Sequence, residues 1–170
     1  MDLSSLMNNV DKVYYFDGEV VNHDLNEVLD GFEIVSPIMY IGEIVKLEGS
    51  NIINVNINYK YKTRCDRCLK DAINKVQTSL SGKLKDYGDA SEKEEENEED
   101  VIYHNKGFLN LDKYIVMEVA SSLPMKSLCS EDCKGICQQC GLDLNEGSCD
   151  CTGNIIDPRL EKLKDFKIED

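Results

Sequence analysis

Aromatic residues are scarce in this sequence, and tryptophan is absent from all 170 positions. Phe, Tyr and Trp make up 7% of the chain, whereas apolar residues as a whole make up 41%. Because aromatic side chains bury the largest areas, the core must be built mainly from aliphatic residues. Long hydrophobic runs are missing too, since no stretch approaches the ~20 apolar residues that cross a bilayer. These absences favour a small globular fold without membrane spans.

Signals for targeting and for catalysis are also lacking. The first six residues have neither the basic nor the apolar segment of a signal peptide, so we expect a soluble, cytoplasmic protein with no membrane partner. Histidine occurs only at His23 and His104, and neither lies in a recognisable triad or metal motif. No phosphate-binding loop, dinucleotide fingerprint or nucleophile elbow is present. We therefore predict that the protein is not an enzyme and has no catalytic residues.

The formal charge of −14 is unevenly distributed along the chain. Residues 86–100 contain nine acidic side chains against one base, Lys93. Such a run repels itself and buries nothing, which predicts a disordered acidic loop over about 86–101. A sharper interpretation is that the loop mimics nucleic acid and shields a basic surface of the same protein. Residues 57–85 supply that surface, with eight basic residues and two acidic ones.

The clearest structural pattern is a hairpin with cysteines at its tip. Apolar residues from Ile53 to Tyr61 alternate with polar ones, and residues 72–85 alternate in the same way. This period of two predicts two half-buried antiparallel strands joined by the turn Arg64–Lys70. The basic side chains then collect on the solvent face of the hairpin, where they could contact phosphates or simply be solvated. The candidate nucleic-acid-binding residues are Lys60, Lys62, Arg64, Arg67, Lys75, Lys83 and Lys85.

Weaker patterns complete the predicted architecture. They indicate, in chain order, a short helix over 2–9, a strand over 13–21, a helical turn over 24–30, a bent or edge strand over 32–47 broken by Pro37 and Gly42, a helix from Asn110 to Ser122, and a C-terminal helix beginning at Asp157-Pro158. We expect an α+β fold, with a small antiparallel sheet or partly open barrel and a few short helices. Residues 1–128 would form this core, and residues 129–170 a cysteine-rich tail with the C-terminal helix.

The eight cysteines form four close pairs, with spacings C-x2-C and then C-x3-C-x3-C-x2-C-x8-C-x-C. In a reducing compartment, close cysteine pairs indicate metal ligands or redox groups rather than disulfides. Two closed four-thiolate sites, structural rather than catalytic, would use all eight. The preferred partition joins Cys65 and Cys68 to Cys129 and Cys133, and groups Cys137, Cys140, Cys149 and Cys151. The competing partition joins the four from Cys129 to Cys140, and leaves Cys65 and Cys68 to meet Cys149 and Cys151.

Zinc is the expected metal, as one or two ions, although four cysteines could also hold an iron–sulfur cluster. Gly141, directly after Cys140, suits the tight backbone of a zinc knuckle. A thioredoxin-like redox role for Cys65 and Cys68 would require their motif to open a helix after a strand. Here the motif joins two predicted strands, which disfavours redox catalysis.

Several of these motifs together resemble one known family. The turn Arg64-Cys65-Asp66-Arg67-Cys68-Leu69 resembles the C-x-R-C-L signature of the bacterial YceD family, the large ribosomal RNA subunit accumulation proteins. The resemblance extends from Asp2–Leu6, through Leu123–Cys129 and Cys133–Gly141, to Leu144–Cys151 and Asp157–Leu160. The pair Cys65 and Cys68 alone is a weak signal, whereas the pair together with the six-cysteine tail is specific.

The resemblance implies a non-enzymatic factor that supports normal levels of large-subunit ribosomal RNA and binds metal and nucleic acid. The expected partner is precursor ribosomal RNA or a basic ribosomal protein. Two rival functions stay open. The chain could be an acidic protein-binding module for a basic ribosomal protein, since the charge outside residues 57–85 is strongly negative. It could also be a redox or metal-buffering protein, which would need an exposed Cys65 or Cys68 of low pKa.

Overall fold

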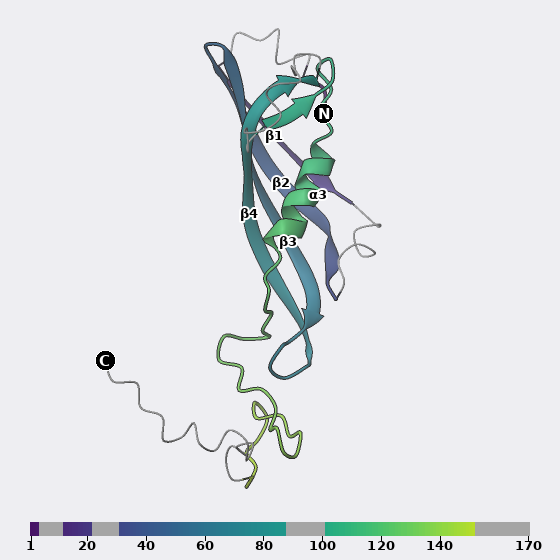
Figure 1. Cartoon of the computed structure of the whole chain (residues 1–170), viewed down its shortest axis with the longest axis vertical. Coiled ribbons are helices and arrows are strands. Elements are labelled where there is room, and N and C mark those ends of the chain that lie inside the picture. The colour runs from purple at the N-terminus through teal and green to yellow at the C-terminus, as the bar shows by residue number, and fades with distance from the viewer. Residues whose placement is uncertain (4–11, 22–30, 88–100, 152–170) are drawn as a thin grey trace, which may run out of the picture.

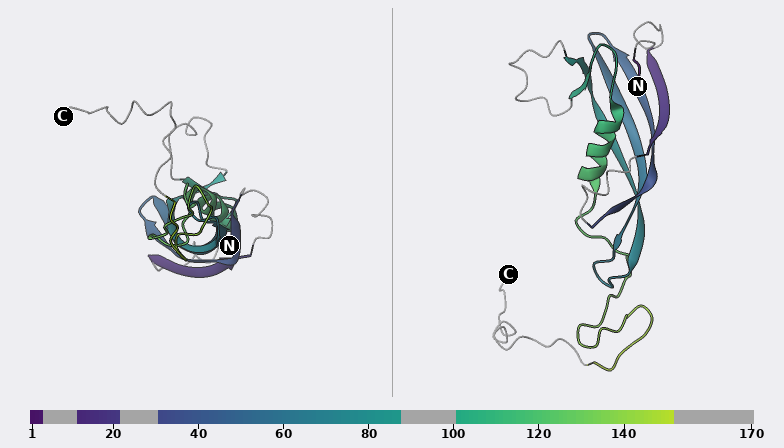
Figure 2. Two further views of the ribbon diagram at one scale, coloured as in Figure 1. Left: turned by 90° about the horizontal axis from the view of Figure 1, so that it is seen from below. Right: turned by 90° about the vertical axis from the view of Figure 1, so that its right-hand side faces the viewer.

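A single five-stranded sheet dominates the computed structural model, which describes residues 1–3, 12–21, 31–87 and 101–151. The strands are β1 (Val13–Val20), β2 (Glu33–Leu47), β3 (Ser50–Arg64), β4 (Asp71–Asp86) and β5 (Val101–His104), and they lie in chain order across the sheet. The sheet is long and twisted, with the helix α3 (Leu111–Ser122) lying along one face (Figures 1 and 2). The cysteine-rich segment lies beyond one end of the sheet (Figure 1).

The predicted hairpin is confirmed. β3 and β4 pair antiparallel from Asn51 with Leu84 to Arg64 with Asp71, so the turn at residues 65–70 forms the tip. Along β3 the exposed fraction alternates as the sequence predicts, because Ile53, Ile57 and Tyr59 are buried while their neighbours face outward. We call the face with these buried residues the inner face and the opposite one the outer face.

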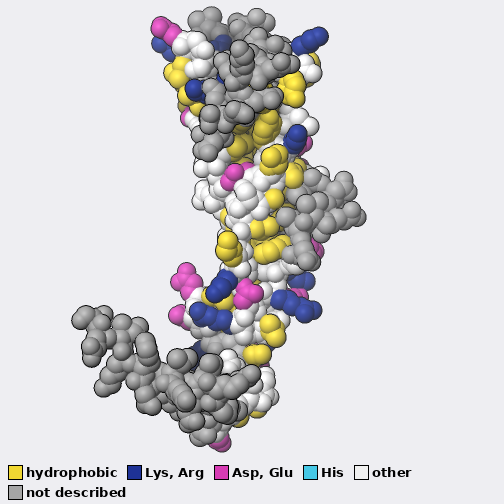
Figure 3. Space-filling view, viewed as in Figure 1, with side chains coloured by type: hydrophobic (Ala, Val, Ile, Leu, Met, Phe, Trp, Pro, Cys, Tyr) yellow, Lys and Arg dark blue, Asp and Glu magenta, His cyan; other side chains and the backbone are white. Residues whose placement is uncertain are grey.

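The core lies between the inner face and α3. Ile115 and Val119 of the helix are fully buried in one cluster with the aliphatic residues of β3, and the hydroxyls of Tyr59 and Ser122 form a hydrogen bond at 2.9 Å. On the face that carries α3, hydrophobic side chains form a band along the long axis (Figure 3). A mainly aliphatic core therefore suffices for this fold, as the scarcity of aromatic residues predicts.

The strand β2 is bent but is not an edge strand, which corrects one of the two alternatives for residues 32–47. It pairs with β1 on one side and β3 on the other, and its register shifts between Val35 and Met39. Pro37 lies within this bulge, where its missing N–H breaks no regular ladder bond. At Gly42 a side chain would collide with the Phe16 ring at 2.4 Å, so glycine lets this aromatic ring of β1 cover the strand.

The predicted α+β class is correct only in part, because the structure is mostly sheet. The described residues contain one α-helix, and β1 and β5 are the two edges of an open sheet rather than a closed barrel. The sheet is also not wholly antiparallel, since β4 and β5 run parallel. Strand β5 was not predicted, because four residues directly after an acidic run show too little alternation.

Two of the weaker element predictions are confirmed, at 13–21 and at 110–122. Asn110 occupies the N-cap of α3, although its side chain makes no capping hydrogen bond. Leu123 is extended, as expected for a residue before Pro124. Residues 4–9 of the predicted helix over 2–9, the helical turn over 24–30, the C-terminal helix beginning at Asp157 and most of the predicted acidic loop fall outside the described residues, while Asp2 forms a β-bridge with Phe108. No helix within the described ranges is long and apolar enough to cross a membrane.

Candidate metal centres and basic hairpin face

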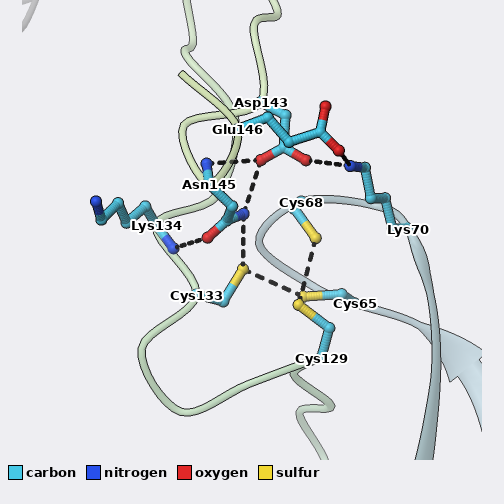
Figure 4. Close-up of polar contacts among 9 residues, drawn as sticks. All are labelled: Cys65, Cys68, Lys70, Cys129, Cys133, Lys134, Asp143, Asn145 and Glu146. Carbon is cyan, nitrogen blue, oxygen red and sulfur yellow. Dashed lines mark hydrogen bonds and ion pairs between the residues drawn. The ribbon is translucent and has the colours of Figure 1, made fainter. Parts of the chain in front are cut away.

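Four sulfur atoms converge where the hairpin tip meets the segment after α3 (Figure 4). Cys65 and Cys68 come from the tip, and Cys129 and Cys133 from the segment. All four Sγ atoms lie within 4.8 Å of one another. The Sγ–Sγ distance is 3.8 Å between Cys65 and Cys133, and 3.6 Å between Cys68 and Cys129. We call this group the first tetrad.

These separations suit a tetrahedral ion rather than a disulfide. With zinc–sulfur bonds of about 2.3 Å, a regular tetrahedron places its sulfurs about 3.8 Å apart. A disulfide needs a sulfur–sulfur distance of about 2.0 Å, and all eight cysteines are free. Four thiols without histidine or carboxylate are also the donor set of a closed structural zinc site. The first tetrad therefore fits zinc in both chemistry and spacing.

The other four cysteines form a second tetrad, Cys137, Cys140, Cys149 and Cys151, whose Sγ atoms also lie within 4.8 Å of one another. The cysteines thus gather in space as the preferred partition has them. The two tetrads differ in exposure: three cysteines of the first tetrad are buried and only Cys129 is exposed, whereas no cysteine of the second tetrad is buried. We therefore expect an ion in the second tetrad to be the easier one to remove.

The two C-x2-C turns share one backbone design. Cys65 N donates to Lys70 O at 2.8 Å, and Leu69 N donates to Cys65 O at 2.9 Å. The second turn repeats this pattern, with Cys137 N bonded to Leu142 O and Gly141 N to Cys137 O, both at 2.8 Å. In each turn the residue after the second cysteine has a positive φ, +61° at Leu69 and +75° at Gly141. The role assigned to Gly141 from sequence is therefore confirmed, while Leu69 holds the same conformation at a steric cost.

Backbone N–H groups favour a thiolate at the first cysteine of each turn. Burial opposes the charge on Cys65, but the N–H groups of Cys68, Cys129 and Arg67 outweigh it and lower its pKa to about 6. At Cys137, the N–H groups of Cys140 and Gln139 lower the pKa to about 6. The pKa of Cys129 is raised, because hydrogen bonds to Cys133 and Cys68 favour its protonated form. All four thiols can be deprotonated together in so small a space only when a cation offsets their charge.

Polar side chains join the first tetrad to the loop 143–146, which lies between cysteines of the second tetrad in the chain (Figure 4). Lys70, at the hairpin tip, forms ion pairs with Glu146 and with Asp143, the latter at 2.6 Å. Asn145 donates from Nδ2 to Cys133 Sγ at 3.5 Å and to Asp143 Oδ1 at 2.7 Å, and its Oδ1 accepts from Lys134 N. The loop 143–146, which belongs to the second tetrad, therefore packs against the first.

The hairpin tip is also fixed to the segment before Cys133. Asp66 N donates to Ser127 O at 2.9 Å, and Ser127 N donates to Asp66 Oδ2 at 2.6 Å. Arg67 Nη1 donates to the carbonyls of Cys133 at 2.7 Å and Glu131 at 3.3 Å. The guanidinium of Arg67 is thus occupied by backbone carbonyls, so this candidate RNA contact has a structural task in the free protein.

The structure does not gather the seven predicted RNA-contacting residues into one patch. Lys60, Lys62, Arg64, Arg67 and Lys75 lie in the half of the hairpin next to its tip, whereas Lys83 and Lys85 lie near the far end of β4. Lys75 and Lys83 are eight residues apart on one strand, which corresponds to about 26 Å. The basic surface therefore has two separate parts.

These basic side chains also differ in availability. Lys62 pairs with Asp71 at 3.1 Å, which stabilises its charged form and raises its pKa. Lys60, Arg64, Lys75 and Lys83 are exposed and make no ion pair within the described part of the chain. Tyr59 and Tyr61 are 3% and 2% exposed, so neither is available to stack on a base.

Three residues of the site were missed by sequence reasoning: Ser127, Asp143 and Asn145. The motif Asp143-Leu-Asn145 does carry a usable signal, because Asp side chains commonly accept from the backbone two residues on, and Asn145 N donates to Asp143 Oδ1 at 2.8 Å. Nothing in the spacing, however, indicates that this turn meets the other tetrad.

Residues 53–167, more than half of the chain, match the family model described as large ribosomal RNA subunit accumulation protein YceD. Uncharacterized proteins of Mycobacterium bovis and Mycobacterium tuberculosis are each 33% identical over 99 residues, 58% of this chain and 47% of the relative. An uncharacterized protein of Mycobacterium leprae is 32% identical over 82 residues, 48% of this chain and 37% of that protein. The chain thus spans about half the length, or less, of the mycobacterial relatives that it matches. No solved structure matches.

Proposed function

The chain belongs to the YceD family, and from this we propose that it is a non-enzymatic factor that supports the accumulation of large-subunit ribosomal RNA by binding the precursor RNA. The contact surface is the outer face of the β3–β4 hairpin. Structural zinc in the two tetrads holds the hairpin tip and the segment after α3 together. The protein acts in the cytoplasm, where its thiols remain reduced.

RNA binding is supported by a set of basic side chains on the hairpin that form no ion pair in the described ranges. Lys60, Lys75 and Lys83 lie on the outer face and Arg64 at the end of β3, all exposed and without a carboxylate partner in the described ranges. Although the chain as a whole has a charge of −14, no carboxylate in the described ranges neutralises these basic side chains. They are therefore available to bind phosphate.

Zinc is supported by the closed geometry of the tetrads. Four thiolates leave no open position for water or substrate, which is the arrangement of a structural rather than a catalytic site. His104 also has a structural setting, because its Nδ1 accepts from Gly107 N at 3.4 Å and lies 3.3 Å from Asp86 Oδ2. His23 lies outside the described residues. A non-enzymatic role is the one that these groups support.

The test is the salt dependence of binding to a fragment of large-subunit precursor RNA, followed by fluorescence anisotropy. If these four basic side chains each neutralise one phosphate of single-stranded RNA, the logarithm of the affinity should fall linearly with the logarithm of the salt concentration, with a slope of about −3. A flat response would remove RNA binding from the proposal.

A basic ribosomal protein is the second candidate partner, favoured by the nine acids in residues 86–100. Removing residues 91–100 separates the two functions. If the acidic run shields the basic face, RNA affinity rises in the shortened protein. If the run attracts a basic protein, affinity for that protein falls instead.

A redox or metal-buffering role has less support. Reactive cysteines combine a lowered pKa with exposure. The pKa of Cys65 is lowered to about 6, but its side chain is fully buried. The Cys65 thiol is therefore closed to an incoming disulfide, which leaves the half-buried Cys137, whose pKa is also lowered to about 6, as the more accessible of these two thiols.

A further inference from the structure

Two lysines face each other on the outer face, in the half of the hairpin next to its tip. Lys60 of β3 and Lys75 of β4 are direct cross-strand partners, and both are exposed. Their Cβ atoms are therefore about 5 Å apart, a distance at which like charges destabilise a sheet. Neither lysine has an ion-pair partner in the described part of the chain. An anion bound between them would remove this repulsion.

Two amide side chains occupy the next row of the same face. Asn58 and Gln77 are direct partners, one step from the lysine pair. Both are exposed, and neither makes a side-chain hydrogen bond within the described ranges. By contrast, Asn54, four residues away on the same strand, bonds to Glu43 and Ser81. The amides beside the lysine pair are thus free to bind a ligand with both donors and acceptors.

The bulge in β2 adds an apolar wall to these two rows. Val35 lies opposite Lys60 and Met39 opposite Asn58, with Pro37 between them in the bulge. Together with the lysines and amides, these residues line a groove of about 540 Å³. Val35 and Met39 are 36% and 49% exposed, so the wall is open to solvent. A volume of this size fits a ligand of a few hundred daltons.

We propose that this groove is the binding site for a nucleotide of single-stranded RNA. Its phosphates lie on Lys60 and Lys75, the edge of its base bonds to Asn58 and Gln77, and the base rests on Pro37 and Met39. This inference depends on the proposed RNA-binding function and assigns it to one place on the hairpin. Lys83, about 26 Å away along β4, lies outside this site.

The chemistry of the groove favours an unpaired strand over other anions. Asn and Gln recognise base edges, which single-stranded RNA exposes. In duplex RNA the major groove is too deep and narrow for side chains to read its bases. An acidic peptide would satisfy the lysines, but its side-chain carboxylates accept only, so just its backbone N–H groups could reach the amide oxygens, whereas a base edge presents donors and acceptors side by side.

The experiment measures the salt slope for RNA oligomers of about ten nucleotides, a length within the usual site sizes, with oligo-A, oligo-C, oligo-U and a duplex of equal length as probes. Lys60→Ala and Lys75→Ala should each reduce the steepness of the slope by about 0.7. Lys113→Ala is the control, because this lysine is exposed on α3, outside the proposed contact surface, and should leave the slope unchanged. Zinc content and circular dichroism verify the fold of each variant.

The double variant Asn58→Ala/Gln77→Ala tests the base contacts separately. It should keep the salt slope, because no charge is lost, but reduce differences in affinity among the three homopolymers by about tenfold. Loss of slope without loss of base preference would place the amides outside the site.

The possible failures are distinguishable. If the unaltered protein has a steep slope and the three lysine variants change it equally or not at all, RNA binding stands and the groove is the wrong site. If the unaltered protein shows no salt-dependent binding, the proposed function fails as well. Equal or tighter binding of the duplex, or displacement of the RNA from Lys60 and Lys75 by polyglutamate, would also overturn the assignment.

Discussion

Asn145 donates a hydrogen bond to the sulfur of Cys133, so a loop that closes one cysteine tetrad supports a ligand of the other. Side chains that bond to metal ligands orient them and tune their affinity for the ion. The same asparagine is held by Asp143, which in turn pairs with Lys70 beside Cys68. The tetrads are therefore coupled through residues that are not ligands themselves.

Replacing Asn145 with Ala should weaken zinc binding at the first tetrad by about tenfold, although Asn145 lies in the loop of the second. The reason is the loss of the N–H donor to Cys133 Sγ. Competition against a chromophoric chelator, analysed for two sites, measures the change. Ser148→Ala, an exposed position in the same segment, is the control. Equal affinities in the two variants would show that the contact does not support the site.

Native protein purified without chelator should contain close to two zinc ions per chain. Treatment with a chelator should remove hydrogen-exchange protection from residues 65–70 and 129–151 but not from the centre of β3. This difference is expected because the buried cysteines form a cluster separate from the main core. A metal content near one would mean that one tetrad is unligated. Protein that is metal-free yet keeps protection at the hairpin tip would contradict the structural role of zinc.

Ile57→Ala should destabilise the fold by about 2–5 kcal/mol, because it leaves a cavity in the main core. Ile57 is fully buried at the centre of β3. The control is Ile41→Ala on the outer face, where the side chain is 58% exposed, and the change should stay within about 0.5 kcal/mol. Urea titration of the zinc-loaded protein measures both. Similar costs for the two variants would contradict the assignment of the inner and outer faces.

Stability should fall as pH rises above about 10, because burial raises the pKa of Tyr59 in the folded state. A raised pKa means that the stabilising contribution is complete below the unfolded value of about 10 and is lost as pH rises through the folded value. Tyr59→Phe should cost about 1 kcal/mol at pH 7, since it removes the hydrogen bond to Ser122, and should make the alkaline decline shallower. Thermal melts between pH 7 and 11 test this, with the exposed Tyr15→Phe as the control. An unchanged alkaline slope in Tyr59→Phe would contradict the prediction.

The hairpin could be predicted because strict alternation fixes both the strands and their buried face. Strand β5 could not be predicted, because it pairs with β4 across the acidic run. The local sequence of four residues does not indicate which distant segment they pair with. Pro37 suggested an edge, whereas a bulge accommodates it inside the sheet. The separation of Lys75 from Lys83 follows from counting residues along one strand, so the sequence already held that information.

The cysteine pairs were visible from spacing alone, but their grouping was not. Spacing limits which sulfurs can share an ion only within a short segment. The approach of Cys129 to the hairpin tip depends on where α3 ends and on the bonds between Ser127 and Asp66. Asn145 was hidden for the same reason, since its contact with Cys133 joins two loops.

The order of the strands bears on how the molecule assembles. Every strand pairs with the one that follows it in the chain, so the antiparallel ladders β2–β3 and β3–β4 can each grow outward from their connecting turn. The first tetrad instead joins Cys68 to Cys129, 61 residues later, and closing a loop of that length in an unordered chain costs about 4 kcal/mol. Once β3 and β4 have paired and α3 has docked, most of that entropy is already lost. We therefore expect the ion to bind last and to stabilise a nearly folded protein, rather than to nucleate folding.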